Sequence, residues 1–437
     1  MSETIIGFLI ILLFFVLMFL KMPIAVSLAL SGFIGLTIIL SPEAAFRVVA
    51  KDIYANFASY SLSVIPMFVF MGYVAFHSGI GQSLFTLAYK VVGHLSGGLA
   101  IAAQLTCGAF GAVCGSTTAT AATIGAIALP EMRKYKYNDS LSTASVAAGG
   151  AMSALIPPST VMIVYGIATE QSIGRLFLSG IIPGIILMLL FILTVYILTK
   201  RNPALAPRGP KASMGEIVHA LKGGVLEVAI VFIVALGGLF MGVFTSTESG
   251  AIGAFAILVI SLIERRLTLK SIVKALRDTT KTSAMIMLIV GGAVVFGRLM
   301  AVSRLPFELA SWAGDLPFHS VFVVAIVFVI YVVIGLFMDS MALILLTVPI
   351  FYPVVVTTLG YAPIWFGVII VMVMAAGVIT PPVGMNVYVI KGIAPDIPLM
   401  TIYRGIWPFL GAIFVCVGIL IAFPTLCTFL PNLLMGK

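Results

Sequence analysis

The chain has 437 residues, of which 61% are hydrophobic and 9% charged, whereas an ordinary soluble domain carries about 25% charged residues. This composition excludes a soluble globular protein, and at about 20 apolar residues per membrane helix the chain has room for ten or more spans. The net charge of +9 would suit nucleic-acid binding in a soluble chain, but basic residues of a multi-span protein gather in its cytoplasmic loops. We therefore expect no nucleic-acid partner.

The predicted elements are membrane helices along the whole chain. The first is an apolar run that ends at Leu20, and since no basic residue precedes it, it indicates a membrane helix rather than a cleaved signal peptide. No segment shows the alternation typical of a membrane β-barrel, so we predict an all-α polytopic membrane protein. The apolar stretches lie at about 4–20, 23–40, 60–76, 99–130, 141–168, 176–199, 225–243, 250–263, 283–302, 319–358, 363–390 and 405–430.

Basic residues form three clusters, which we place in the cytoplasm. The middle cluster lies in a long polar stretch that contains three prolines and sits near the centre of the chain, which indicates a linker between two halves. The clusters are Arg133, Lys134 and Lys136; Lys200, Arg201, Arg208, Lys211 and Lys222; and Arg265, Arg266, Lys270, Lys274, Arg277 and Lys281.

The two halves of the chain match each other at a shift of 224 residues. Matches that keep one register indicate structural repeats, and secondary transporters are commonly built from halves of opposite membrane orientation. We therefore predict two inverted repeats. The matches are Gly111 with Gly335, Ser116 with Ser340, Thr123 with Thr347, and Pro157-Pro158 with Pro381-Pro382.

In each repeat, one polar, glycine-containing segment and one double proline interrupt the apolar runs. Two successive prolines remove two backbone donors and disfavour helical geometry before them. A helix broken at membrane depth leaves carbonyl oxygens that protein or an aqueous cavity must satisfy, and these oxygens, with Ser and Thr hydroxyls, suit a small hard cation such as sodium. The alternative is that the double proline is only a kink and that Gly111 and Gly115 mark a close helix contact.

Two charged residues are candidates for function. Asp339 stands inside an apolar run, where an ionised group is costly without a partner, so we predict that it supports a cation; a helix-end position is the alternative. Arg298 beside a cavity would bind a substrate carboxylate or sulfonate, with snorkelling to the membrane interface as the alternative. The sequence has no Walker loop and no zinc-protease motif, so an intramembrane enzyme is the weakest reading.

Four motifs together resemble the large membrane subunit of the tripartite ATP-independent periplasmic (TRAP) transporters, and the resemblance covers essentially the whole chain. It implies a sodium-driven, elevator-type importer, with Na⁺ as the coupling ion and no cofactor. It also implies a small four-helix membrane subunit and a periplasmic binding protein that delivers an organic acid, in the inner membrane of a bacterium or archaeon. The motifs are residues 108–116, 129–132, 148–159 and 377–386.

The resemblance further implies two sodium sites made mostly by backbone carbonyls. The second set is the first shifted by 224 residues, so the internal repeat supports both. The first set is Cys114, Ser116, Ser153, Ile156 and Pro158, and the second is Met338, Ser340, Gly377, Thr380 and Pro382. Gly115, Thr117 and Asp339 would support these sites, and Arg298, Ser159 and Asn386 are substrate candidates.

These expectations divide the chain into six parts. The alternative function is a stand-alone sodium- or proton-coupled anion transporter that needs no binding protein. The parts are N-terminal scaffold helices (1–56), a first repeat with hairpin and broken helix (57–199), a basic cytoplasmic linker (200–224), further scaffold helices (225–282), a second repeat with hairpin and broken helix (283–404) and a C-terminal helix (405–437).

Overall fold

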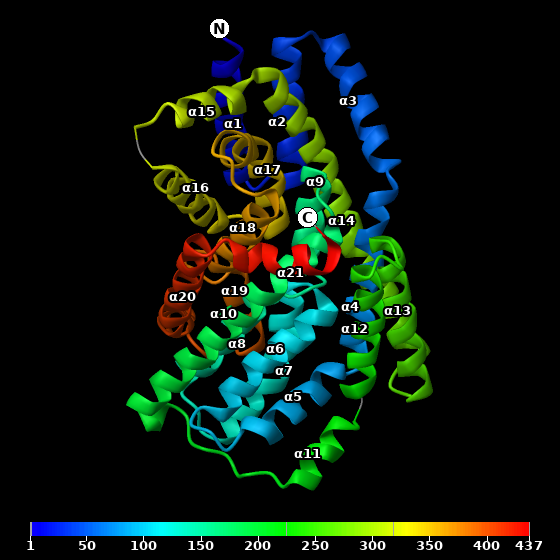
Figure 1. Ribbon diagram of the computed structural model, residues 1–437, viewed down its shortest axis with the longest axis vertical. Coiled ribbons are helices and arrows are strands. Elements are labelled where there is room, and N and C mark those ends of the chain that lie inside the picture. The colour runs from blue at the N-terminus through cyan, green and yellow to red at the C-terminus, as the bar shows by residue number, and fades with distance from the viewer. Residues whose placement is uncertain (1, 224, 318, 437) are drawn as a thin grey trace.

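The computed structural model describes residues 2–223, 225–317 and 319–436, without the side chain of Glu227. These residues form an elongated helical molecule, with no β-strand among them (Figure 1). The predicted all-α fold is therefore confirmed. Within the described residues, six helical segments are long and apolar enough to cross a membrane: Tyr60–His77, Ile173–Arg201, Ser246–Ile263, Leu269–Ser303, Ser340–Thr358 and Leu399–Ala422.

The helices of the first half follow one another closely. The N-terminal ones are α1 (Glu3–Phe19), α2 (Ile24–Ile39) and α3 (Pro42–Phe57), followed by the 3-10 turn η1 (Tyr60–Ser63). The first repeat comprises α4 (Val64–His77), α5 (Ile80–Val92), α6 (Gly98–Cys114), α7 (Thr117–Lys134), α8 (Asp139–Met152), α9 (Thr160–Thr169) and α10 (Ile173–Arg201).

A connecting region leads into the second half. It consists of η2 (Pro203–Leu205), α11 (Met214–Leu221), α12 (Val225–Phe240) and α13 (Ser246–Ile263). The second repeat then comprises α14 (Leu269–Ser303), α15 (Leu305–Gly314), α16 (Ser320–Gly335), α17 (Ser340–Tyr352), the π-helical η3 (Pro353–Thr358), α18 (Pro363–Gly377), α19 (Met385–Ile393) and α20 (Leu399–Ala422), before the terminal α21 (Thr425–Met435).

The two repeats use the same order of elements and run in opposite directions. In each, a hairpin (α6–α7 or α16–α17) precedes a helix broken at the double proline (α8–α9 or α18–α19). In Figure 1, α8 lies in the lower half and leads up to α9, whereas α18 leads down to α19. The first hairpin lies in the lower half of the view and the second in the upper half. The arrangement is that of inverted repeats.

The breaks begin and end for local reasons. Both double prolines lie in irregular segments, 153–159 and 378–384, and each contains a cis peptide bond. Asn138, Ser159 and Asp339 each accept a hydrogen bond from a backbone N–H in the first turn of α8, α9 and α17, respectively. Such residues are preferred N-caps because the first N–H groups of a helix have no partner within it.

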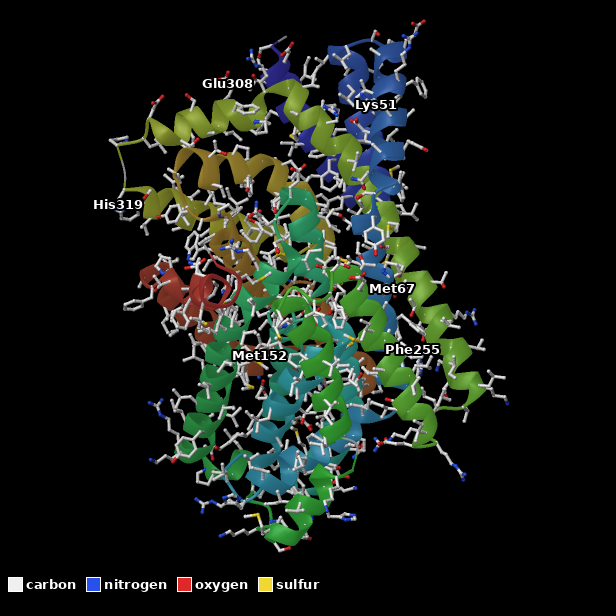
Figure 2. The ribbon with its side chains drawn as sticks, turned by 45° about the vertical axis from the view of Figure 1, so that its right-hand side comes forward. Lys51, Met67, Met152, Phe255, Glu308 and His319 are labelled. Carbon is white, nitrogen blue, oxygen red and sulfur yellow. The ribbon has the colours of Figure 1, made fainter. Side chains whose placement is uncertain are left out.

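Each broken helix also packs against the other repeat. α9 lies against α17 and α18, and α19 lies against α7 and α8. The Tyr165 hydroxyl of α9 donates to the Pro363 carbonyl at 2.6 Å, and the Asn386 amide of α19 donates to the Ala147 carbonyl at 3.1 Å. The two repeats therefore cross at the centre of the molecule. Figure 2 shows Met152, the last residue of α8, within this interior.

The predicted domain boundaries do not all coincide with helix ends. The boundary after residue 282 falls within α14, and the one after residue 404 falls within α20. The predicted linker contains η2, an irregular stretch and α11. Residues 1, 224 and 437, which bound three of the predicted parts, lie outside the described residues. The division into scaffold and repeats stays a prediction.

Candidate functional site

In the first repeat, the tip of the α6–α7 hairpin closes on the broken segment between α8 and α9. Thr160 donates to the Gly115 carbonyl oxygen from its N–H at 3.3 Å and from its hydroxyl at 2.9 Å. Gly115 has φ +63°, and a Cβ atom there would overlap the Pro158 carbonyl oxygen. The tip therefore needs glycine at this position, and its closure brings Cys114 and Ser116 next to Pro158.

Ser153 and Ile156 lie in the same broken segment. A Cβ atom on Gly111 would lie 2.6 Å from the Ser153 Cβ atom, so α6 and the end of α8 are in close contact. Ser153 is fully buried, and its hydroxyl donates to the Gly150 carbonyl at 2.8 Å. Its departure from glycine thus adds a bond within the end of α8. The close helix contact expected as an alternative at Gly111 is present together with the break.

In the second repeat, the equivalent contact is between Gly335 and Gly377. A Cβ atom on Gly377 would lie 3.0 Å from the carbonyl carbon and oxygen of Gly335. Met338 and Ser340 are buried at the tip of the α16–α17 hairpin, and Thr380 lies in the broken segment that follows α18. Four of the five predicted members therefore follow the plan of the first set.

Several carbonyl oxygens at the two breaks accept no hydrogen bond. Among the described donors, none bonds the carbonyl oxygens of Cys114, Ile156 and Pro158 in the first repeat, or those of Met338 and Thr380 in the second. A buried carbonyl without a partner is uncommon and costly. Backbone oxygens exposed by broken helices are the usual ligands of sodium in secondary transporters, so both sets fit such an ion.

The fifth position differs between the two sets. Pro158 is buried, whereas Pro382 is exposed to solvent. The Pro382 carbonyl accepts a hydrogen bond from the Tyr403 hydroxyl at 2.9 Å, and the same hydroxyl lies 2.8 Å from the Val383 carbonyl oxygen. The second break is therefore held by α20 rather than by its hairpin tip.

Asp339 lies at the tip of the second hairpin, where the first hairpin has Gly115. Its carboxylate accepts a hydrogen bond from the Met341 N–H at 3.1 Å and caps α17. The helix-end position considered from the sequence is thus what the structure shows, next to the second carbonyl set. Thr117, predicted to support the first set, is the first residue of α7 at the other tip. Among the described residues, no group of three or more His, Cys, Asp or Glu side chains could hold a metal.

A polar cavity of about 1020 Å³ opens between α3, η1, the end of α9 and α14, and a second of about 290 Å³ adjoins it and reaches α17. Asn56, Glu170 and Gly297 line both. The cavities have the volume and the few polar groups of a small-molecule site. They lie in the upper half of the molecule, on the side of Lys51 in Figure 2, away from α11 and its neighbouring basic residues.

The three substrate candidates lie in different places. Arg298 lines the larger cavity but already binds Asp52, with Nε 2.5 Å from one carboxylate oxygen and Nη2 2.9 Å from the other. Ser159 is fully buried and caps α9, and Asn386 is fully buried with its amide bonded to Ala147. Neither lines the two cavities, so only Arg298 is close to a space that could hold a substrate.

Sequence reasoning missed four residues of this region: Asp52 and Asn56, which line the cavity, and Thr160 and Tyr403, which hold the two breaks. A signal existed for Thr160, because a hydroxyl residue directly follows the break after Ser159. Asp52 bonds a residue 246 positions away, so no local pattern could have indicated that pair.

Comparison with known proteins follows this geometry. The sequence model of the family described as the tripartite ATP-independent periplasmic transporter, DctM component, matches residues 11–426. The C4-dicarboxylate TRAP transporter large permease protein DctM of Pseudomonas aeruginosa is 36% identical over 93% of this chain and 94% of its own. The sialic acid TRAP transporter large permease protein SiaM of Vibrio cholerae is 31% identical over 96% and 97%.

The fold is also similar to a crystal structure of the Alcanivorax borkumensis YdaH transporter. The TM-score is 0.54 at 16% sequence identity, over 89% of this chain and 90% of that one. The family resemblance noted in the sequence is confirmed by the matches over nearly the full chain. The chain is therefore a multi-pass membrane protein of the DctM component family of tripartite ATP-independent periplasmic transporters, a transporter permease rather than an enzyme.

Proposed function

We propose that this permease imports an organic anion together with sodium ions across the inner membrane of a bacterium or archaeon. One observation carries the proposal: two sets of carbonyl oxygens without hydrogen bonds recur at a shift of 224 residues, each where a hairpin tip meets a broken helix. Each sodium ion that enters down a 100 mV potential contributes about 2.3 kcal/mol, so two ions can drive accumulation without ATP.

Two features support an anionic substrate. Arg298 and Asn56 present hydrogen-bond donors to a cavity on the side opposite the basic loops, which the positive-inside rule places in the cytoplasm. The relatives named above carry a C4-dicarboxylate and sialic acid, both organic acids. Arg298 can fork onto a carboxylate once Asp52 releases it, so the substrate enters from the periplasmic side in exchange for that bond.

The movement we propose is an elevator, in which both hairpins and both broken helices move as one unit. The crossed packing of α9 on α17 and of α19 on α7 supports it, because the two units cannot separate without losing these contacts. A small membrane subunit extends the fixed part, and a periplasmic binding protein delivers the substrate. These two partners are expected from the family.

The test is substrate uptake into proteoliposomes that contain the permease, the small subunit and the binding protein. A thermal-shift screen of the binding protein against carboxylates, sugar acids and sulfonates first identifies the substrate. We expect uptake with an inward sodium gradient and none in sodium-free buffer. Equal uptake in sodium-free buffer would overturn sodium coupling, and uptake without the binding protein would favour a stand-alone transporter.

A further inference from the structure

A buried tyrosine holds the broken segment of the second repeat. Tyr403, near the start of α20, is 6% exposed, and its hydroxyl lies 2.9 Å from the Pro382 carbonyl oxygen and 2.8 Å from that of Val383. A phenol has one proton to donate, so the two carbonyls share it. The hydrogen bond thus fixes the chain between the double proline and the start of α19.

The first repeat has no such bond. The residue equivalent to Tyr403 at the shift of 224 is Ser179, whose hydroxyl donates at 2.6 Å to the Leu176 carbonyl of its own helix. There the broken segment is held instead by Thr160, which bonds the hairpin tip at Gly115. The two repeats therefore support equivalent segments with different residues.

A steric reason explains the difference. A Cβ atom on Gly115 would overlap the Pro158 carbonyl oxygen, and the second repeat has Asp339 at the equivalent position. A tip with a side chain cannot close on the Pro382 carbonyl in the same way. Gly384 stands in place of Thr160, so it offers no hydroxyl to the tip. The second segment needs another support, and Tyr403 supplies it.

We propose that Tyr403 is a positioning residue for the second ion site. By holding the Pro382 carbonyl it sets the distance of this oxygen from those of Thr380 and Met338. A carbonyl oxygen has two lone pairs, so one remains for a cation while the other accepts from Tyr403. Loss of a partner behind a metal ligand commonly lowers metal affinity about 10- to 100-fold. The inference rests on the sodium coupling proposed above.

The test measures initial uptake against sodium concentration in proteoliposomes with the complete tripartite system. We expect Tyr403→Phe to raise the half-saturating sodium concentration about tenfold, while the maximal rate at saturating sodium stays at the wild-type value. A general folding defect would lower the maximal rate instead. Tyr388→Phe is the matched control, because Tyr388 lies half exposed on α19 and should retain wild-type values for both quantities.

The wild-type arm separates the two proposals. If wild-type uptake does not depend on sodium, the proposed function itself is overturned. If it does, and Tyr403→Phe has the wild-type half-saturation or only a lower maximal rate, the positioning role is overturned. Should Tyr403→Phe fail to accumulate, Tyr403→His carries the same test. Its ring N–H ends short of the phenol oxygen, so half-saturating sodium should rise, and a wild-type value would overturn the inference.

Discussion

The first halves of the two broken helices occupy equivalent places but are built from different side chains. α8 is buried along Leu141–Met152 and consists mainly of Ala, Gly, Ser and Thr. α18 is buried along Ile364–Gly377 and carries Trp365, Phe366 and several Ile, Val and Met residues. Small residues let helix backbones approach closely, so α8 is enclosed by neighbouring backbones, whereas α18 fills the space around it with its own bulk. The repeat symmetry therefore lies in the backbone breaks and not in the packing.

The hairpin tips differ in the same sense. The first tip is closed on its broken segment by Thr160 and by close contact at Gly115. The α4 helix also presses on it, since a Cβ atom on Gly72 would lie 2.7 Å from the Cys114 carbonyl oxygen. At the equivalent place on α14, Gly297 has only the Pro349 side chain near it, at 3.7 Å, and lines the cavities. The first unit is tightly packed, and the second borders open space.

The largest effect is expected from Gly115→Ala. The new Cβ atom would overlap the Pro158 carbonyl at a residue with positive φ, so the first tip cannot close, and uptake should fall by more than about tenfold. Gly242→Ala is the matched control, because Gly242 has φ +73° and no atom within 4 Å of the added Cβ. Uptake by this control should stay near wild type. Equal uptake by the two variants would show that the closed tip is not required.

The next effect is expected from Asp339→Asn. Asparagine caps a helix about as well as aspartate, so α17 should still begin at Ser340 while the charge is lost. A unit charge a few ångströms from a cation contributes more than about 1 kcal/mol even in a high dielectric. We therefore expect half-saturating sodium to rise about tenfold in uptake assays. An unchanged value would leave Asp339 with the capping role alone.

A smaller effect is expected from Thr160→Val. It keeps the shape of the side chain and removes the hydroxyl bond to Gly115, which contributes about 1 kcal/mol. Half-saturating sodium should rise about fivefold. Thr169→Val on the same helix loses only a bond to the Tyr165 carbonyl of its own helix and serves as control. If both variants shift sodium dependence equally, the tip bond has no special role.

The smallest effect is expected at the surface, between the end of α7 and the loop before α20. The Arg133 guanidinium lies 2.6 Å from the Asp396 carboxylate and holds the pKa of Asp396 below its ordinary value of 3.8. A lowered pKa stabilises the fold above the ordinary value, and this contribution is lost as the pH falls through the folded pKa. Exposed pairs contribute little, so Asp396→Asn should shift the melting temperature by less than about 2 °C at neutral pH. A larger shift would mean that this contact helps to hold the two repeats together.

The sequence alone predicted the helical fold, the repeat register and the positions of both breaks, because Gly, Pro and polar residues stand out in apolar runs. It could not predict what closes each break. Thr160 and Tyr403 act through contacts with residues 45 and 21 positions away, and such pairs are set by helix packing rather than by local pattern. The same holds for Arg298, whose type suggested a substrate contact but whose partner Asp52 is 246 positions away.

The crossing of the broken helices has a consequence for stoichiometry. Since α9 is packed on α17 and α19 on α7, a displacement of one ion site drags the other with it. In the proposed cycle, a half-loaded carrier would therefore have to travel with an empty set of carbonyls into the membrane interior, at the cost of burying bare dipoles. Such a penalty discourages leak, and it would fix the number of ions moved per substrate without any separate gate to count them.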